Sequence, residues 1–232
     1  QTCALPIYFL TETYLSLRRL ENEIIADQTK EAQGQTAMMG LGADFAGIKV
    51  SIGQFYGIEI NDFAVTVART ALWIAESQMM KETEAIISIP LNFLPLKSYT
   101  NIVEGNALRI DWETVVPKKE LSYIMGNPPF VGYTYQSKEQ KTDLAELKTG
   151  AGKNIDYVAG WYLKAAKMIY NTHIRTAFVS TNSIAQGEQV SACFLVAAFV
   201  LFSRVSLTAA TRRIISGHFF KSDGFAFTSH RQ

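Results

Sequence analysis

The residues with the clearest chemical potential are Asn127 and Phe130, in the stretch Gly126-Asn127-Pro128-Pro129-Phe130. The apolar run before it, residues 121–125, is typical of a short buried strand. Neither proline can donate a main-chain hydrogen bond, and a residue before proline is pushed out of the helical region, so the chain must leave the sheet here. We therefore expect the Asn amide and the Phe ring at the carboxyl end of a strand, where open α/β sheets bind ligands.

Two acceptors and an aromatic ring suit a flat substrate that carries an amino group. The side-chain oxygen of Asn127 and the main-chain oxygen of Pro128 can converge on an exocyclic amine, and the ring of Phe130 can stack on a base. The alternative interpretation is an ordinary strand-to-loop turn.

Two more polar residues follow predicted strands. Glu59 ends the strand predicted over residues 54–60, where a carboxylate can accept hydrogen bonds from both hydroxyls of a ribose. Asn106 follows the strand predicted at Ile102-Val103 and can offer its amide to an adenine ring. Taken singly, a solvated charge and a turn residue are the simpler interpretations. Taken in order, a ribose acceptor, an adenine contact and an amino-group clamp follow successive strands.

The elements that must position these residues alternate along the chain. The patterns predict helices over residues 9–30, 61–80 and 156–170, and strands over residues 54–60, 102–103, 121–126 and 176–180. Loops are expected at residues 31–53 and 132–153, the second being mobile and beside the site. This alternation predicts an α/β fold with a doubly wound, mostly parallel sheet.

Helical spacing also predicts which faces are buried. In the helix predicted over residues 9–30, the expected apolar face consists of Leu10, Tyr14, Leu17 and Ile24, and the expected solvated face of Arg18, Arg19, Glu21 and Glu23. In the helix predicted over residues 61–80, the expected apolar face consists of Phe63, Val67, Ala71 and Ile74.

Composition narrows the class of protein. The 232 residues suffice for one sizeable domain, and 48% hydrophobic with 19% charged residues is a globular composition. The formal net charge of +1 gives no overall signal for nucleic acid. Two cysteines, Cys3 and Cys193, make neither a disulfide framework nor a metal site, and the isolated His173 suggests a structural or exposed residue. No secretory signal is evident and the longest apolar run, residues 192–202, is too short to span a bilayer, so a cytoplasmic location is expected.

Three motifs together resemble the class I S-adenosylmethionine-dependent methyltransferases, in particular the MmeI-like branch of DNA adenine-N6 methyltransferases. The Asn-Pro-Pro-Phe stretch resembles their catalytic motif. Tyr56-Gly57-Ile58-Glu59-Ile60 resembles the acidic cofactor motif, and Glu104-Gly105-Asn106-Ala107-Leu108 the next one. Wider stretches, GIEINDFAVTVARTALWIAESQM, GNPPFVGYTYQSKEQK and FVSTNSIAQGEQV, are similar to the same branch.

The resemblance implies a Rossmann-like methyltransferase fold and a mechanism. A target adenine is flipped out of double-stranded DNA, its N6 amino group is held by Asn127 and Pro128, and Phe130 stacks on the base. Pro129 completes the motif. No metal is implied. The residues implied to bind S-adenosylmethionine are Phe9, Glu59, Ile60, Asn106 and Ala107.

The ends of the chain depart from the family pattern. Leu5 and Ile7 stand where the family has the glycines of its first cofactor loop, although Phe9-Leu10 fits the end of that motif. Residues 1–8 are therefore interpreted as non-native or corrupted, with loss of the cofactor loop as the alternative. Residues 9–190 are interpreted as a partial catalytic domain. Residues 191–232 are interpreted as a divergent, frameshifted tail, with a final helix and strand that close the sheet as the alternative. The sheet is then incomplete at both ends, and the target-recognition domain and any fused nuclease lie outside the chain.

Two alternative functions remain open. One is methylation of RNA or of a protein glutamine on the same fold, since such turns hold other planar amino groups. The other is a catalytically dead fragment that keeps the fold but cannot bind cofactor.

Overall fold

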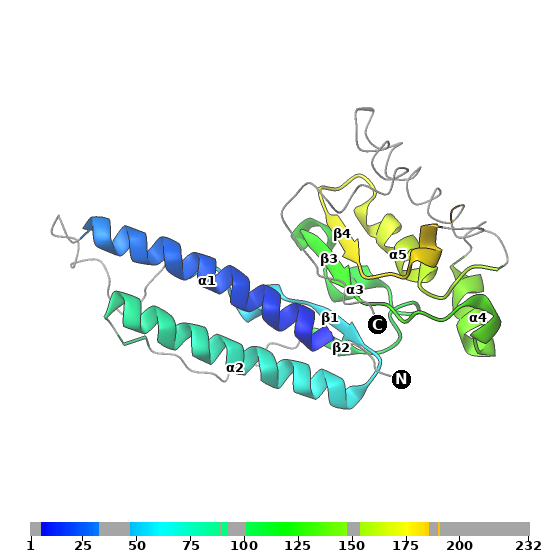
Figure 1. Cartoon of the computed structure of the whole chain (residues 1–232), viewed down its shortest axis with the longest axis horizontal. Coiled ribbons are helices and arrows are strands. Elements are labelled where there is room, and N and C mark those ends of the chain that lie inside the picture. The colour runs from blue at the N-terminus through cyan, green and yellow to red at the C-terminus, as the bar shows by residue number, and fades with distance from the viewer. Residues whose placement is uncertain are drawn as a thin grey trace.

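The computed structural model describes residues 6–32, 47–88, 90–91, 101–147, 154–185 and 190. Long helices α1 and α2 lie on one side of the molecule, and the shorter helices α3, α4 and α5 lie on the other, around strands β3 and β4 (Figure 1). The described elements, in order, are α1 (Pro6–Ala32), η2 (Ile52–Gln54), β1 (Gly57–Glu59), α2 (Asp62–Ile87), β2 (Ile102–Glu104), α3 (Trp112–Val115), η3 (Lys118–Glu120), β3 (Tyr123–Gly126), η4 (Tyr133–Tyr135), α4 (Lys138–Glu146), α5 (Ala159–Ile169), β4 (Arg175–Phe178) and η5 (Asn182–Ala185).

The strands form two parallel pairs. β1 pairs with β2, with Glu59 opposite Glu104, and β3 pairs with β4, with Gly126 opposite Phe178. Each pair is joined by a helical crossover, as parallel strands require. The predicted mixed α/β architecture with parallel pairing is thus confirmed. Among the described residues the two pairs do not hydrogen-bond to each other, so the continuous doubly wound sheet stays a prediction.

One apolar cluster is shared by both strand pairs. Ile58 of β1, Ile124 of β3 and Phe178 of β4 all pack against the cluster formed by Trp112, Ala165 and Met168. Helix α1 contacts both β1 and β3, and Thr13 of that helix lies 3.4 Å from the sulfur of Met125. The two pairs therefore rest on common supports.

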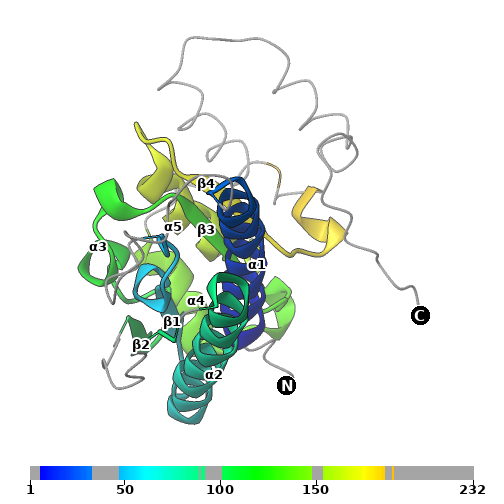
Figure 2. The ribbon, with the colours of Figure 1, turned by 90° about the vertical axis from the view of Figure 1, so that its left-hand side faces the viewer.

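Helices α1 and α2 pack side by side along most of their length (Figures 1 and 2). Asn61 caps α2, its side-chain oxygen accepting from the main-chain N–H of Ala64 at 3.1 Å, as the sequence predicts. The predicted buried face of α2 is wrong, because Phe63 is 73% exposed and Ile74 is 55% exposed. The helix is apolar on more than one side, so spacing alone does not select the face that meets α1. The residues buried there are Val65, Ala68, Leu72, Ala75 and Met79.

The predicted solvated face of α1 is also corrected. The Arg18 side chain is completely buried; it forms an ion pair with Glu21 and donates to Thr83 of α2 at 2.7 Å. Leu17 and Ile24, predicted to be buried, are 43% and 51% exposed. Polar partners on the neighbouring helix make burial of the arginine possible, and they are invisible in the periodicity of α1.

The loop predicted over residues 132–153 is corrected in its described part, residues 132–147. They contain η4 and α4, and α4 begins with a capping box in which Ser137 and Gln140 satisfy each other's main-chain N–H groups. Two residues of α4, Asp143 and Leu144, are buried. This helix brings a carboxylate into the region of the predicted site.

Candidate functional site

The Asn-Pro-Pro-Phe turn leaves the sheet where the sequence predicts. β3 ends at Gly126, whose main-chain oxygen still accepts from the N–H of Val179 at 3.0 Å. Pro128 is buried, whereas Pro129 and Phe130 are exposed, with Phe130 46% accessible. The side-chain oxygen of Asn127 is buried, and no described residue donates a hydrogen bond to it. Five other buried polar atoms of the described residues share this property, among them the side-chain oxygen of Gln136, and at the end of β3 an amino or hydroxyl group would satisfy the acceptor.

The chain after the turn is anchored to the segment before α5. The main-chain oxygen of Val131 accepts from the N–H of Tyr157 at 2.9 Å, and the N–H of Tyr133 donates to the carboxylate of Asp156 at 3.2 Å. The buried Gln136 side chain donates to the main-chain oxygen of Ile155 at 2.9 Å. These bonds hold the ring of Phe130 on a fixed support.

Glu59 is a buried carboxylate without a cation. It is 7% exposed, and one of its oxygens accepts from the main-chain N–H of Asn61 at 3.0 Å. Among the described residues no Lys or Arg pairs with it. A buried carboxylate is costly unless donors surround it, so this site suits a ligand that brings hydroxyl groups. The neighbouring Ile60 is 63% exposed at the same strand end.

Asn106 and Ala107 lie beside Glu59 but are held by protein groups. Gly105 donates its main-chain N–H to the main-chain oxygen of Glu59 at 2.8 Å, which fixes this loop to the end of β1. The oxygen of the Asn106 amide accepts from the N–H of Leu108 at 2.9 Å, and its nitrogen donates to Asp143 at 2.9 Å. The second hydrogen of that nitrogen is what remains for the predicted adenine contact.

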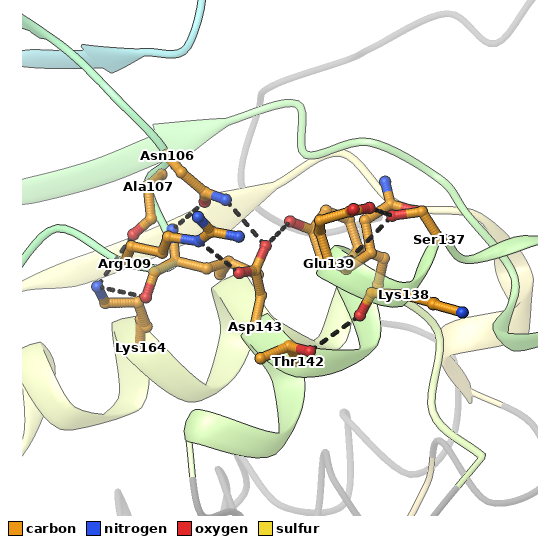
Figure 3. Close-up of polar contacts among 12 residues, drawn as sticks. Asn106, Ala107, Arg109, Ser137, Lys138, Glu139, Thr142, Asp143 and Lys164 are labelled. Carbon is orange, nitrogen blue, oxygen red and sulfur yellow. Dashed lines mark hydrogen bonds and ion pairs between the residues drawn. The ribbon is translucent and has the colours of Figure 1, made fainter.

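Asp143 accepts from three donors on two segments, and Figure 3 shows the two on the loop after β2, Asn106 and Arg109. Arg109 donates to it at 2.6 Å and the Tyr157 hydroxyl at 2.8 Å, in addition to Asn106. Burial alone would raise the pKa of Asp143, but the hydrogen bonds from Arg109, Tyr157 and Asn106 outweigh it, and the pKa lies below its usual value. This carboxylate therefore stays charged at neutral pH.

Lys164 of α5 contacts the same loop from another direction. Its ammonium group donates to the main-chain oxygens of Ala107 and Leu108 at 3.0 and 3.1 Å, and also to that of Ile110. Burial lowers the pKa of the Lys164 ammonium group, and the negative charge of Asp111 only partly opposes this effect. Sequence reasoning missed Asp143, Arg109 and Lys164; the capping box before α4 is the signal that could have revealed the first of them.

The structure thus divides the predicted site residues into groups. Glu59, Ile60, Asn106 and Ala107 form one group at the ends of β1 and β2, and residues 127–130 form another at the end of β3. Phe9 lies in the first turns of α1 and packs edge-on against Tyr8, with ring centroids 6.4 Å apart. Leu5 lies outside the described residues, and the chain at Ile7 is already helical rather than a loop.

The described residues contain no group of three His, Cys, Asp or Glu side chains that could hold a metal ion, and His173 is exposed. In the same part of the chain, no helix combines the length with the apolar character needed to cross a membrane.

Comparisons with known proteins agree with the motifs. The family model described as MmeI, DNA-methyltransferase domain, matches residues 8–211. DNA methyltransferase A of Bacillus subtilis (strain 168) is 41% identical over 188 residues, which are 79% of this chain and 20% of that protein. The solved structure of the type IIL restriction-modification enzyme MmeI in complex with DNA superposes with a TM-score of 0.71 and 39% identity, over 82% of this chain and 25% of that one.

The chain spans only 20% and 25% of the lengths of these two relatives. Within that span the predicted resemblance is confirmed, and the chain belongs to the family of the MmeI DNA-methyltransferase domain.

Proposed function

We propose that the chain is the methyltransferase part of a DNA-modifying enzyme and promotes methyl transfer from S-adenosylmethionine to the N6 amino group of adenine in DNA. The observation that carries this proposal is the buried, unpartnered side-chain oxygen of Asn127 at the end of β3. Family membership and the likeness to a structure that contains DNA support the choice of substrate.

The acceptor at Asn127 fits an exocyclic amine. An unpaired buried acceptor costs about 1–3 kcal/mol, and an amino hydrogen placed against it removes this cost. The main-chain oxygen of Pro128 would accept the second hydrogen of the same group. With both hydrogens held, the lone pair of the nitrogen is directed at the methyl donor. Positioning of this kind supplies much of the acceleration in such transfers.

Phe130 would hold the base itself. A base in a duplex is out of reach, so the adenine must be flipped out before it meets Asn127. The partly exposed ring of Phe130, on its anchored segment, offers a stacking face worth about 1–3 kcal/mol per base. Pro129 stiffens the connection between amide and ring.

The residues at the ends of β1 and β2 fit a nucleoside cofactor. Glu59 would accept from the ribose hydroxyls, which explains a buried carboxylate without a cation. Asn106 and Ala107 would border the adenine, with the exposed Ile60 beside them, and Phe9 would lie toward the methionine portion. When bound, S-adenosylmethionine supplies an electrophilic methyl group.

Sequence recognition is assigned to a further part of the parent protein. The longer relatives contain four to five times the length spanned here. We infer that a target-recognition domain, and any nuclease, accompany this chain in a restriction–modification enzyme in the cytoplasm.

The experiment compares the unaltered chain with Asn127→Ala. Calorimetry measures the dissociation constant for S-adenosylmethionine, and mass spectrometry measures N6-methyladenine in duplex DNA. We expect Asn127→Ala to change cofactor affinity less than twofold and to lower methyl transfer at least a hundredfold, because it removes a contact to the reacting group alone. Gln28→Ala, which removes an exposed amide of α1, is the matched control and should change neither quantity.

Other outcomes decide between the alternatives. Methylation of RNA or of a protein glutamine, with duplex DNA unmodified, would favour the same-fold alternative. Absence of cofactor binding in the unaltered chain would favour the catalytically dead fragment. Equal loss of cofactor binding and methyl transfer in Asn127→Ala would contradict the role of this residue.

A further inference from the structure

We propose that Asp143 is a positioning residue for cofactor binding: through Asn106 and Arg109 it fixes the loop after β2 in the arrangement that receives S-adenosylmethionine. This inference rests on the proposed function, and it assigns a role to a residue that touches neither the cofactor nor the base. The carboxylate acts through the side chains that it orients.

Asp143 is a buried carboxylate whose hydrogen bonds hold neighbouring side chains in place. The residue is 3% exposed, and its two oxygens accept from Asn106 and Arg109 at 2.9 and 2.6 Å (Figure 3) and from Tyr157 at 2.8 Å. All three partners donate, so a carboxylate suits the position and an amide does not: an Asn side chain would turn a donor toward another donor. Hydrogen bonds to a charged group are also the stronger kind.

The three partners connect different parts of the proposed site. Asn106 and Arg109 belong to the loop after β2, and that loop is bonded to the end of β1 at Glu59. Tyr157 belongs to the segment that anchors Val131, one residue after the catalytic turn. Asp143 thus joins the cofactor side of the site to the side that would hold the base.

The main chain of the loop has a separate holder. Lys164 bonds to the main-chain oxygens of Ala107, Leu108 and Ile110, and the Trp112 indole donates to Ala107 at 2.8 Å. Those bonds fix the path of the loop and do not involve the Asn106 side chain. The Asn106 amide is held at its oxygen by the main-chain N–H of Leu108 and at its nitrogen by Asp143, and the bond to Asp143 is the one that ties it to another segment.

A purely structural role is the competing explanation, because Leu144 and Leu147 beside Asp143 belong to the apolar cluster of this region. The two explanations differ in what they predict for cofactor affinity. A structural role lowers stability and leaves the dissociation constant of the folded protein unchanged. A positioning role weakens cofactor binding in protein that is still folded, and the weakening depends on Asn106.

The test is a double-mutant cycle in the full chain. Asp143→Asn, Asn106→Ala and the double variant are measured by calorimetry with S-adenosylmethionine and by denaturant unfolding. We expect Asp143→Asn to weaken binding about tenfold, as loss of a charge-assisted hydrogen bond implies, and to raise KM for the cofactor more than it lowers kcat. In the Asn106→Ala background the same change should weaken binding less than twofold. Glu146→Gln, an exposed carboxylate of the same helix, is the matched control.

Arg109→Gln keeps the test decisive if Asp143→Asn fails to fold. The Arg109 side chain is 54% exposed, so its replacement leaves the core intact but removes one tether of the loop. Weaker cofactor binding at unchanged stability supports positioning. Unchanged affinity in every folded variant, or losses that simply add in the cycle, overturns it. Absence of cofactor binding by the unaltered chain overturns the proposed function as well, whereas unchanged cofactor affinity in Asp143→Asn overturns the positioning role alone.

Discussion

Gly105 donates its main-chain N–H to the main-chain oxygen of Glu59 at 2.8 Å, and this bond joins the loop after β2 to the end of β1. Gly105 has a φ of 150°, a conformation that side chains rarely allow. A Cβ atom added there would lie 2.4 Å from the end of the Ile110 side chain. The position therefore requires glycine, and it lies next to two predicted cofactor-binding residues: Glu59 through the hydrogen bond and Asn106 as the following residue.

The first prediction is that Gly105→Ala is destabilising. The substitution imposes backbone strain and displaces Ile110, so we expect the free energy of unfolding to fall by about 1–3 kcal/mol. Cofactor affinity should fall with it, because Asn106 is the next residue. Denaturant unfolding and calorimetry measure the two effects.

Gly132→Ala is the control for this prediction. Gly132 has a φ of −63°, and an added Cβ would meet nothing closer than 3.6 Å. We expect its unfolding free energy to change by less than about 1 kcal/mol, with a gain as the more frequent result at such positions. Equal losses in the two variants would show that strain at Gly105 is not the cause.

The second prediction concerns the buried arginine between the long helices. Arg18→Ala removes the ion pair with Glu21 and the bond to Thr83, and it leaves the largely buried Glu21 carboxylate without its cation. We expect the free energy of unfolding to fall by about 3–5 kcal/mol. Arg19→Ala, which changes the exposed neighbour on the same helix, should alter it by less than about 0.5 kcal/mol. A small effect at both positions would mean that burial of Arg18 does not stabilise the pairing of α1 and α2.

The parts of the fold that the sequence could predict depend on local features such as helix caps and prolines. Asn61 caps α2, the diproline ends β3, and the short apolar runs become parallel strands, because caps and prolines act within a few residues of themselves. The order of motifs also predicted the family, since Glu59, Asn106 and Asn127 each follow a strand.

What the sequence could not predict depends on partners far away in the chain. The burial of Arg18 requires Thr83, 65 residues later, and the anchor at Asp143 requires Asn106, 37 residues earlier. Helix α4 was not predicted because its composition is polar and its buried side contains the charged Asp143 beside Leu144, without an apolar stripe. Periodicity reports apolar faces, so a buried ion held by distant donors leaves no trace in it.

The third prediction concerns alkaline pH. Burial, and the bond to Asp143, raise the pKa of Tyr157 from 10.0 to about 12. Between those values the unfolded chain has lost this proton and the folded chain keeps it, so stability falls as the pH rises through this range. At pH 8 we expect Tyr157→Phe to be about 1 kcal/mol less stable than the unaltered chain, because the substitution removes the hydrogen bond to Asp143. Between pH 8 and pH 11 the variant should lose less stability than the unaltered chain.

Denaturant unfolding at pH 8 and pH 11 measures this difference, and comparison of the two proteins cancels the groups that they share. Tyr14, whose pKa is also raised by burial, remains in both and should leave a residual loss in the variant. Identical pH dependence in the two proteins would show that Tyr157 does not titrate differently on unfolding.

The fourth prediction tests the ring that would stack on the base. Phe130→Ala should lower methyl transfer to duplex DNA about tenfold or more and leave the cofactor dissociation constant within twofold, since one stacked base contributes about 1–3 kcal/mol. Phe130→Trp should retain most of the activity, because it keeps a flat apolar face. Tyr170→Ala, which removes a ring of similar exposure after α5, is the control. Equal activity in Phe130→Ala and Tyr170→Ala would mean that the base is held by the acceptors at Asn127 and Pro128 without the ring.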